Sequence, residues 1–279
     1  MQDLGRHAVL VTGATDGLGK RVASELARRG ARVLLHGRSE ERLKATLGEI
    51  REGSGSDRLC SYLADFSSLE EVRGLAGRIL SDEGRLDVLV NNAGIIVRER
   101  DESQDGYELT FAVNYLSHFL LTRLLLPLLS DDAPARIVNV ASAGQSPVDF
   151  EDPMLERDYD AMKAYSQSKL AQIMFTIELA DRLSDTRVSV NALHPASLMD
   201  TKMVKETFGH TMSTVEEGAE ATVRLAASLE LEGVTGRYFD GKREARADSQ
   251  AYDERARKKL WDLSERLCGP SLEPIVSPR

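Results

Sequence analysis

The feature that most constrains this chain is a glycine-rich turn between an apolar strand and an amphipathic helix near its start. The predicted strand Ala8 to Thr12 runs straight into Gly13, and the predicted helix Leu18 to Arg29 follows. Glycines permit tight turns and close backbone approach, and the N–H groups and dipole of a helix N-terminus favour a pyrophosphate. The turn therefore predicts dinucleotide binding, with an ordinary glycine turn as the alternative. Its candidate contacts are Gly13, Thr15, Asp16, Gly17, Leu18 and Gly19.

Apolar runs of strand length alternate with longer amphipathic segments along most of the chain. This alternation is typical of repeated βαβ units around a parallel sheet. The other predicted strands are Arg32 to His36, Arg58 to Leu63, Asp87 to Val90, Arg136 to Ala141, Val188 to Leu193 and Arg237 to Phe239. The other predicted helices are Glu40 to Arg51, Ser68 to Ser81, Ser103 to Leu129, Tyr159 to Ser184 and Thr214 to Ser228. The predicted fold class is α/β: a single-domain Rossmann fold with a doubly wound, seven-stranded parallel sheet and helices on both faces.

The chain is interpreted as one catalytic unit with a short C-terminal extension. Its 279 residues are compatible with a single large α/β domain, assigned to 1–245. Within it, a segment near 198–214 is predicted to form a lid over a substrate pocket. The remainder, 246–279, is predicted to hold a helix from about Ser249 to Leu267 and a tail, packed on the same domain or fraying from it.

Charge and composition argue against several classes of partner. The formal net charge of −9 opposes attraction to a phosphate backbone, so nucleic acid is not expected as a partner. No signal-peptide h-region and no run of about 18 apolar residues is evident, so we expect a cytoplasmic protein without integral membrane association. Cys60 and Cys268 form neither a C-x-x-C pair nor a Cys/His cluster, so neither a disulfide framework nor a metal site is predicted.

The end of the second predicted strand bears on the choice of nucleotide. The run His36-Gly37-Arg38-Ser39 lacks the acidic side chain that would hold an NAD ribose 2′-hydroxyl and repel a 2′-phosphate. Arg38 can pair with that phosphate, although it can also be a solvated residue in a surface turn. NADP(H) is therefore the expected cofactor, with NAD(H) as the alternative.

Two further segments carry candidate acid-base chemistry. Tyr165 and Lys169 lie four residues apart within a helical pattern, so their side chains share one helix face. The ordinary pKa of Tyr is about 10, and a unit charge at ~4 Å contributes about 4 kcal/mol at an effective dielectric of 20, enough to lower that pKa by ~2 to 3 units. Ser142 ends a predicted strand, where its hydroxyl can hold a substrate oxygen or bond to nearby backbone.

Taken together, these segments resemble the short-chain dehydrogenase/reductase family. The resemblance lies in the spacing of the glycines in the first turn, in the run Asn91-Asn92-Ala93-Gly94 after the fourth predicted strand, and in the order of serine, tyrosine and lysine. It implies that the catalytic residues are Asn114, Ser142, Tyr165 and Lys169. It implies further cofactor contacts from Asp65, Phe66, Asn91, Ala93, Gly94, Tyr165, Lys169, Pro195 and Thr201.

The resemblance also implies roles for these residues. Lys169 would contact the nicotinamide ribose, and Asn114 would link Lys169 to a water-mediated proton path, with a structural hydrogen bond as the alternative for Asn114. Asp65 would lie beside adenine and could also cap the next helix. Asn91 would lie under the adenosine and stabilise the central sheet. Ala196 departs from the pattern, because the family has a Pro-Gly turn at this point.

The substrate expected from this resemblance is bulky and partly apolar. Tyr165 follows Ser142 by 23 positions, which resembles the retinol-dehydrogenase and protochlorophyllide-reductase branch of the family. The intervening Pro147 to Asp152 and the lid region could shape a pocket. Apolar lid contacts are expected from Met199, Met203, Phe208 and Met212. The two long predicted helices, Ser103 to Leu129 and Tyr159 to Ser184, resemble the paired helices through which family members dimerise, so a homodimer or homotetramer is expected.

The expected function is an NADP(H)-dependent oxidoreductase that interconverts a carbonyl and an alcohol, with Tyr165 as general acid and base. Two alternatives remain open. One is a catalytically idle NADP(H)-binding regulator, because cofactor affinity can persist without turnover. The other is a sugar-nucleotide epimerase or dehydratase, which also uses Tyr/Lys chemistry.

Overall fold

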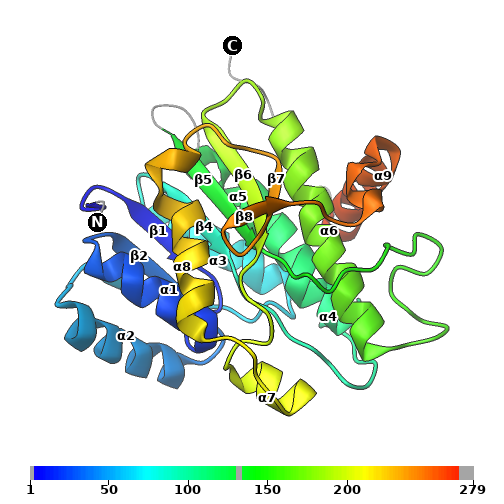
Figure 1. Ribbon diagram of the computed structural model, residues 1–279, viewed down its shortest axis with the longest axis horizontal. Helices are drawn as coiled ribbons and strands as arrows, with labels where there is room; N and C mark the ends of the chain where they lie inside the picture. The colour runs from blue at the N-terminus through cyan, green and yellow to red at the C-terminus, as the bar shows by residue number, and fades with distance from the viewer. Residues whose placement is uncertain (1–2, 130–133, 270–279) are drawn as a thin grey trace.

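The computed structural model describes residues 3–129 and 134–269, which form one sheet covered by helices (Figure 1). The strand order is β3-β2-β1-β4-β5-β6-β7-β8, so the chain starts in the middle, builds one edge, and returns to build the other. The strands are β1 (Ala8–Val11), β2 (Arg32–Gly37), β3 (Leu59–Leu63), β4 (Val88–Asn91), β5 (Ala135–Val140), β6 (Val188–His194), β7 (Arg237–Asp240) and β8 (Arg243–Ala245). The predicted doubly wound α/β fold is confirmed.

The predicted count of seven strands misses one edge strand, β8. This strand pairs antiparallel with β7, whereas the other neighbouring strands of the sheet pair in parallel. Only Gly241 and Lys242 separate Asp240 from its partner Arg243, and Gly241 has a φ of 55°, which suits a two-residue hairpin turn. The short polar run of β8 does not resemble a buried strand, so the hydrophobic pattern does not reveal it.

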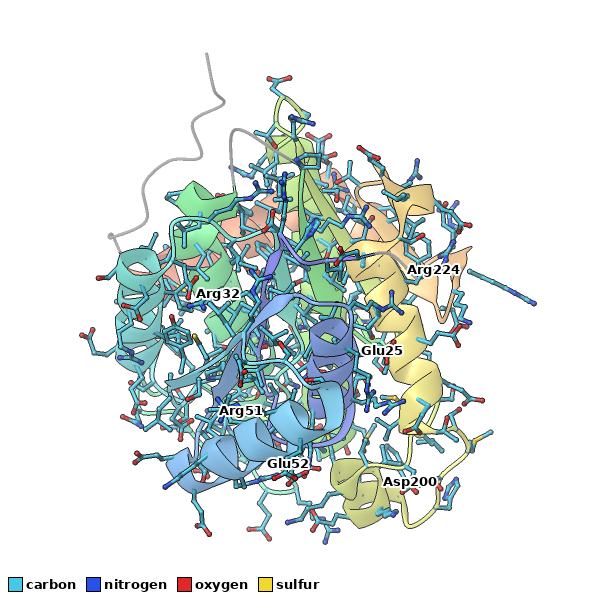
Figure 2. All side chains as sticks on the ribbon, turned by 90° about the vertical axis from the view of Figure 1, so that its left-hand side faces the viewer. Glu25, Arg32, Arg51, Glu52, Asp200 and Arg224 are labelled. Atoms are coloured by element: carbon cyan, nitrogen blue, oxygen red, sulfur yellow. The ribbon has the colours of Figure 1, made fainter. Side chains whose placement is uncertain are left out.

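Two layers of helices cover the sheet because each strand alternates its apolar side chains between two faces. The helices are α1 (Gly17–Arg28), α2 (Glu40–Ser54), α3 (Leu69–Asp82), α4 (Leu109–Phe111), α5 (Ser117–Leu129), α6 (Ala161–Arg182), α7 (Lys202–Phe208), α8 (Val215–Ala227) and α9 (Glu254–Cys268). Val9 and Val11 share a core with α1, α2 and α8, whereas Leu10 and Leu34 share a core with α3, α5 and α6. Figure 2 looks onto the first layer, with Glu25 on α1 and Arg224 on α8.

The predicted helix from Ser103 to Leu129 begins only at Leu109. Ser103 donates a backbone hydrogen bond to Tyr107 at 2.7 Å, and Gly106 has a φ of 79°, so this stretch forms a turn in place of the first helical turns. A π-helical turn, Ala112–Leu116, then separates α4 from α5. Such a turn leaves an irregularity in the helical hydrogen bonding, and π-bulges are frequent at functional sites.

Among the described residues, the stretch Leu109–Leu129 is long and apolar enough to pass as a membrane span. Its most apolar window has a mean hydropathy of 1.3, and 78% of that window is buried inside the fold. The expectation that no such run exists is therefore wrong. A helix buried on all sides is apolar on all sides, so core packing accounts for this composition.

The C-terminal segment packs against the main body through α9. Trp261 is 2% exposed, and its ring centroid lies 5.1 Å from that of Phe119 on α5 and 6.0 Å from that of Phe175 on α6. The Ser264 hydroxyl lies 2.7 Å from the Tyr115 hydroxyl. The predicted helix from Ser249 to Leu267 is divided into a 3₁₀ turn, Ser249–Tyr252, and α9, because Asp253 caps a new helix. The predicted tail after 269 lies outside the described residues.

Candidate active site

The turn after β1 is too tight for side chains at two of its glycines. A Cβ on Gly19 would lie 2.2 Å from the carbonyl oxygen of Gly13, and a Cβ on Gly13 would lie 2.9 Å from Cα of Ala93. Gly13 and Gly17 also have positive φ angles of 63° and 47°. Asp16 caps α1 by accepting a hydrogen bond from the N–H of Gly17 at 2.8 Å. The glycines therefore bring the N-terminus of α1 close to the ends of β1 and β4.

Thr12 holds this turn against the end of β4, and sequence reasoning missed its role. Its Oγ1 accepts hydrogen bonds from the N–H groups of Asn92 at 2.8 Å and Ala93 at 3.0 Å. The Asn92 side chain donates to the carbonyl of Thr12 at 2.8 Å. A threonine at the end of the strand, directly before the first glycine, is the signal that could have identified this contact.

Two guanidinium groups lie near the end of β2. Gly37 leaves no room for a carboxylate side chain, because a Cβ there would lie 2.6 Å from Cγ2 of Thr15. Arg38 is exposed and has no ion-pair partner within 3–129 and 134–269. Arg42, which sequence reasoning missed, lies 2.9 Å from Asp16 and 3.5 Å from the carbonyl of Thr15. The negative charge of Asp16 in the glycine turn is thus paired with the guanidinium of Arg42, which lies in the first turn of α2.

The predicted cofactor contact from Phe66 cannot come from its ring. That ring is 4% exposed and stacks on His36 with a centroid distance of 4.1 Å. His36 accepts a hydrogen bond from the N–H of Gly13 at 3.3 Å, and burial lowers its pKa to about 4, so it supports the turn as a neutral group. Asp65 accepts from the N–H of Ser67 at 2.9 Å and so orders the turn before α3.

Asn91 is fully buried and links strands and helices across the middle of the sheet. Its amide donates to Thr122 on α5 at 2.9 Å and to Asn139 on β5 at 2.8 Å. Asn139 in turn donates to Thr176 on α6 at 2.8 Å. The predicted role of Asn91 in stabilising the central sheet agrees with this geometry, and its predicted place under the adenosine stays a prediction.

Ser142 and Tyr165 meet at the carboxyl end of β5. Ser142 is 8% exposed, and its Oγ accepts a hydrogen bond from the N–H of Gly144 at 3.0 Å, which leaves the hydroxyl proton free for another oxygen. Burial raises the pKa of Tyr165, and hydrogen bonding with the Ser142 side chain lowers this pKa in part. The phenol is therefore a protonated acid beside a hydroxyl that stabilises its anion.

Lys169 lies one turn further along α6, and its ammonium is held by two acceptors other than Tyr165. Nζ donates to the carbonyl of Val140 and to Oε1 of Gln172, both at 2.9 Å, and it lies 5.6 Å from the centre of the Tyr165 ring. Burial lowers the pKa of Lys169 to about 7. Burial is the larger influence on the pKa of Tyr165 in this arrangement, and the expected part of Lys169 in lowering that pKa stays a prediction.

Asn114, inside the π-helical turn, fastens the segment after β4 to α6. Its Oδ1 accepts from the N–H of Ile95 at 2.8 Å, and its amide donates to the carbonyl of Ile95 and to Ser168, both at 3.0 Å. A Cβ on Gly94, the residue before Ile95, would lie 3.6 Å from Nζ of Lys169. Asn114 thus sets the backbone that faces Lys169, and its predicted part in a proton path stays a prediction.

His118 connects the π-helical turn to the nucleotide turn, and sequence reasoning also missed it. Its Nδ1 lies 3.0 Å from the carbonyl of Asn114 and 3.3 Å from the side-chain amide nitrogen of Gln172. Its Nε2 lies 3.1 Å from the hydroxyl of Thr12. Burial lowers the pKa of His118 to about 3, so the ring stays neutral. The two predicted regions of the site are therefore joined by a buried, uncharged contact.

The predicted lid is the segment that carries α7, at the lower edge of Figure 1, and Asp200 in Figure 2 precedes that helix. Thr201 caps α7 by accepting from the N–H of Val204, and its Cγ2 would lie 3.1 Å from a Cβ on Gly17. Leu198 has a φ of 44°, so the strain of this turn falls two residues after Ala196, which replaces the expected glycine without a positive φ. The segment predicted to form a lid therefore begins at a strained residue and lies against the nucleotide turn.

A comparison with family models identifies the family of the chain. The model of the short chain dehydrogenases matches residues 7–211, which include the glycine turn, Ser142, Tyr165 and Lys169. The chain belongs to the short-chain dehydrogenase family. As a member of this family it is an NAD(P)-dependent oxidoreductase that acts on alcohols or carbonyls.

Among curated proteins, this dehydrogenase is similar to retinol dehydrogenases. It is 41% identical to retinol dehydrogenase 14 of Mus musculus, over 94% of this chain and 85% of that protein. It is 37% identical to retinol dehydrogenase 11 of Homo sapiens, again over 94% of this chain and 85% of the other. The expected resemblance to the retinol-dehydrogenase branch is confirmed.

Solved structures of the family agree with the fold of this dehydrogenase. An uncharacterised protein from Mycobacterium paratuberculosis is 30% identical and superposes with a TM-score of 0.80, covering 98% of this chain and 97% of that one. A short-chain dehydrogenase from Escherichia coli CFT073, crystallised with NADPH, is 28% identical with a TM-score of 0.72, covering 87% and 99%.

Proposed function

We propose that this dehydrogenase interconverts a bulky, partly apolar carbonyl compound and its alcohol with NADP(H), and that Tyr165 exchanges the proton. The observation that carries the proposal is the meeting of Ser142 and Tyr165 at the end of β5, with the buried ammonium of Lys169 one helical turn away. Acid, hydroxyl and cation are the groups that proton transfer to a carbonyl oxygen requires.

The residues around the glycine turn fit NADP(H). The N-terminus of α1 favours a pyrophosphate, and Thr201 would face the same region from the lid. Arg38, which is free of protein partners among the described residues, and Arg42, beside Asp16, would hold a 2′-phosphate, and the missing side chain of Gly37 removes the group that would repel it. When bound, NADP(H) supplies or accepts the hydride at the carbon of the substrate.

In the reductive direction, Tyr165 donates its phenolic proton to the substrate oxygen as the carbonyl carbon gains the hydride, which gives an alcohol and a phenolate. The free hydroxyl proton of Ser142 orients the substrate oxygen and stabilises the phenolate. Lys169 then stabilises that anion electrostatically, and a proton from solvent restores the phenol. Alcohol oxidation reverses both transfers.

The substrate class rests on the lid and on the relatives. Phe208 and Met212 of the lid are 37% and 72% exposed, so the lid presents apolar side chains that are not used in the core. The similar retinol dehydrogenases are named for a long apolar alcohol. An apolar alcohol or aldehyde of comparable bulk would bury these side chains on binding.

We further propose that the protein is a cytoplasmic homodimer or homotetramer. Trp261 of α9 already packs on α5 and α6, so a contact through those two helices would have to use the surface that α9 leaves open. Sedimentation of the purified chain over a range of concentrations tests the assembly, and a single monomeric species throughout would contradict it.

The test of the proposed function is a panel of aldehydes, ketones and alcohols assayed with NADPH, NADP, NADH and NAD, for wild type and Tyr165→Phe. We expect turnover that falls about 10²- to 10⁴-fold in the variant, the range for loss of a general acid, with NADPH affinity unchanged. Undiminished turnover in Tyr165→Phe would contradict the mechanism. NADPH binding without turnover of any compound by wild type would instead favour the idle regulator.

A further inference from the structure

The backbone carbonyl of Ser142 is held by two side chains from outside β5. The Tyr238 hydroxyl donates to this carbonyl at 3.1 Å, and the side-chain amide of Gln145 donates to it at 2.9 Å. The Ser142 hydroxyl is fixed separately, by the N–H of Gly144. The backbone carbonyl and the hydroxyl of Ser142 are therefore held by separate donors. Together, the three donors set the direction in which the hydroxyl proton of Ser142 can point.

Tyr238 comes from a part of the chain that the family model does not match. It lies on β7, where it is 5% exposed and pairs with Ala192 of β6 and Ala245 of β8. Burial raises the pKa of Tyr238, so its phenol keeps its proton and remains a hydrogen-bond donor at neutral pH. The chemistry of Tyr165 cannot be transferred to Tyr238, because the proton of Tyr238 is already committed to the carbonyl of Ser142.

Gln145 is itself fixed by the C-terminal segment. Its Oε1 accepts from the N–H of Asp248 at 2.8 Å, two residues before Gln250, whose amide holds both backbone groups of Val148 at 2.6 and 3.1 Å. These contacts pin the loop after Ser142 to residues 248–250. The serine is thus connected to the sheet edge through Tyr238 and to the C-terminal segment through Gln145.

We infer that Tyr238 is a positioning residue for Ser142 and that Gln145 is its partner in this task. The inference rests on the proposed function, because Tyr238 would position the Ser142 hydroxyl that assists Tyr165 in that mechanism. Ser142 lowers the pKa of Tyr165 only while its hydroxyl points at the phenol. Removing the hydroxyl of Tyr238 leaves one donor on the serine carbonyl, so the serine turns more freely and stabilises the phenolate less.

The experiment compares Tyr238→Phe with Tyr107→Phe under the same assay. Tyr107 is the matched control, because its hydroxyl also donates to a backbone carbonyl, that of Leu267, at 2.9 Å, away from the site. We expect kcat for the best substrate to fall about tenfold in Tyr238→Phe, the scale of one buried hydrogen bond, with the Kd of NADPH unchanged. Tyr107→Phe keeps the wild-type kcat.

Two readouts separate positioning from general loosening of the fold. In a Ser142→Ala background, Tyr238→Phe has no further effect on kcat, because the hydroxyl that it positions is gone. With Ser142 in place, the pH at which the rate of alcohol oxidation reaches half its maximum is higher in Tyr238→Phe than in wild type, because the phenolate of Tyr165 is less stabilised. Gln145→Met, which removes the other donor and keeps the hydroxyl of Tyr238, shows the same two effects and serves if Tyr238→Phe does not fold.

Each outcome decides one question. A wild type that turns over no carbonyl or alcohol overturns the proposed function and this inference with it. A wild type that is active while Tyr238→Phe and Gln145→Met match Tyr107→Phe, or lose the same factor in the Ser142→Ala background, overturns the inference alone.

Discussion

In the nucleotide-binding region, residues 8–94, the site is made of short contiguous runs, whereas around Ser142 it is made of side chains from distant parts of the chain. Gly13 to Gly19 form one turn, whose packing is limited by the backbone of the turn itself at Gly19 and by the backbone of Ala93 at Gly13. Ser142 depends on Gly144, Gln145 and Tyr238, and through Gln145 on Asp248. The first region is fixed by steric limits on backbone, and the second by hydrogen bonds that only the folded chain brings together.

One added methyl group should disrupt the close packing of the glycine turn in the nucleotide-binding region. Gly19→Ala places a Cβ 2.2 Å from the carbonyl of Gly13, a contact that backbone atoms cannot avoid without moving the turn. We expect the affinity for NADPH to fall about 100-fold, since overpacking of this kind costs roughly 1 to 3 kcal/mol. Fluorescence titration with NADPH measures the change.

The control for that substitution is Gly48→Ala in α2, where a Cβ meets nothing within 4 Å. This variant keeps its NADPH affinity and gains about 0.5 to 1 kcal/mol in unfolding free energy, because alanine favours a helix more than glycine. Equal NADPH affinities for the two variants would show that the turn is not fixed by steric limits.

In the region around Ser142, the buried Lys169 should make the free energy of unfolding depend on pH. Burial lowers the pKa of Lys169 from 10.5 to about 7. Between these values the unfolded chain binds a proton that the folded chain has released, so the unfolding free energy rises with pH across the window from about 7 to 10.5. The contribution of one proton is at most about 1.4 kcal/mol per pH unit.

Lys169→Met removes this contribution, and we expect urea unfolding between pH 7 and 10 to show a smaller rise in stability for this variant than for wild type. The comparison uses the slope with pH, so it does not depend on the hydrogen bonds that the variant loses to Val140 and Gln172. Parallel slopes for the two proteins would mean that Lys169 keeps its ordinary pKa in the fold.

The preference for NADPH over NADH tests whether Arg42, which sequence reasoning missed, belongs to the nucleotide-binding region. Arg38→Gln and Arg42→Gln should each raise the Kd for NADPH about tenfold, because each removes one charge-assisted contact with a 2′-phosphate. The Kd for NADH, which has no such phosphate, should stay the same. If Arg42→Gln weakens both nucleotides equally, its contact with Asp16 is structural only.

The smallest expected effect concerns the strained start of the lid. Leu198 has a φ of 44°, which costs a side-chain-bearing residue about 1 kcal/mol. Leu198→Gly and Leu198→Ala lose the same side-chain contacts, so we expect the glycine variant to unfold with about 1 kcal/mol more free energy than the alanine variant. Thermal unfolding of the two variants measures this difference. Equal stabilities would show that the backbone at position 198 is not strained.

The contrast between the two regions also explains what could be read from the sequence. Hydrophobic periodicity predicts seven strands and the helices between them, because burial on two faces leaves long apolar runs. It misses β8, which is short, polar and at the edge. It also extends the helix before Leu109, because a turn stabilised by Ser103 and Gly106 has no signature in the apolar pattern.

Within the site, the residues that could be predicted are those with a fixed spacing. The glycines, Ser142, Tyr165 and Lys169 can be identified in that way, and the retinol-dehydrogenase branch with them. Arg42, His118 and Tyr238 could not, because each acts through a hydrogen bond or ion pair to a residue far away in the sequence. The position of the Lys169 ammonium depends on Gln172, which no spacing rule includes.

The packing of Trp261 on Phe119 and Phe175 has a consequence for how the molecule is made. During synthesis the chain emerges from its N-terminal end, so the two phenylalanines leave the ribosome long before the tryptophan that covers them. Until then the nascent chain exposes an apolar strip that chaperones and other nascent chains can bind. A premature stop shortly before α9 would therefore yield a product that aggregates, even though the glycine turn and the catalytic serine, tyrosine and lysine would all be present.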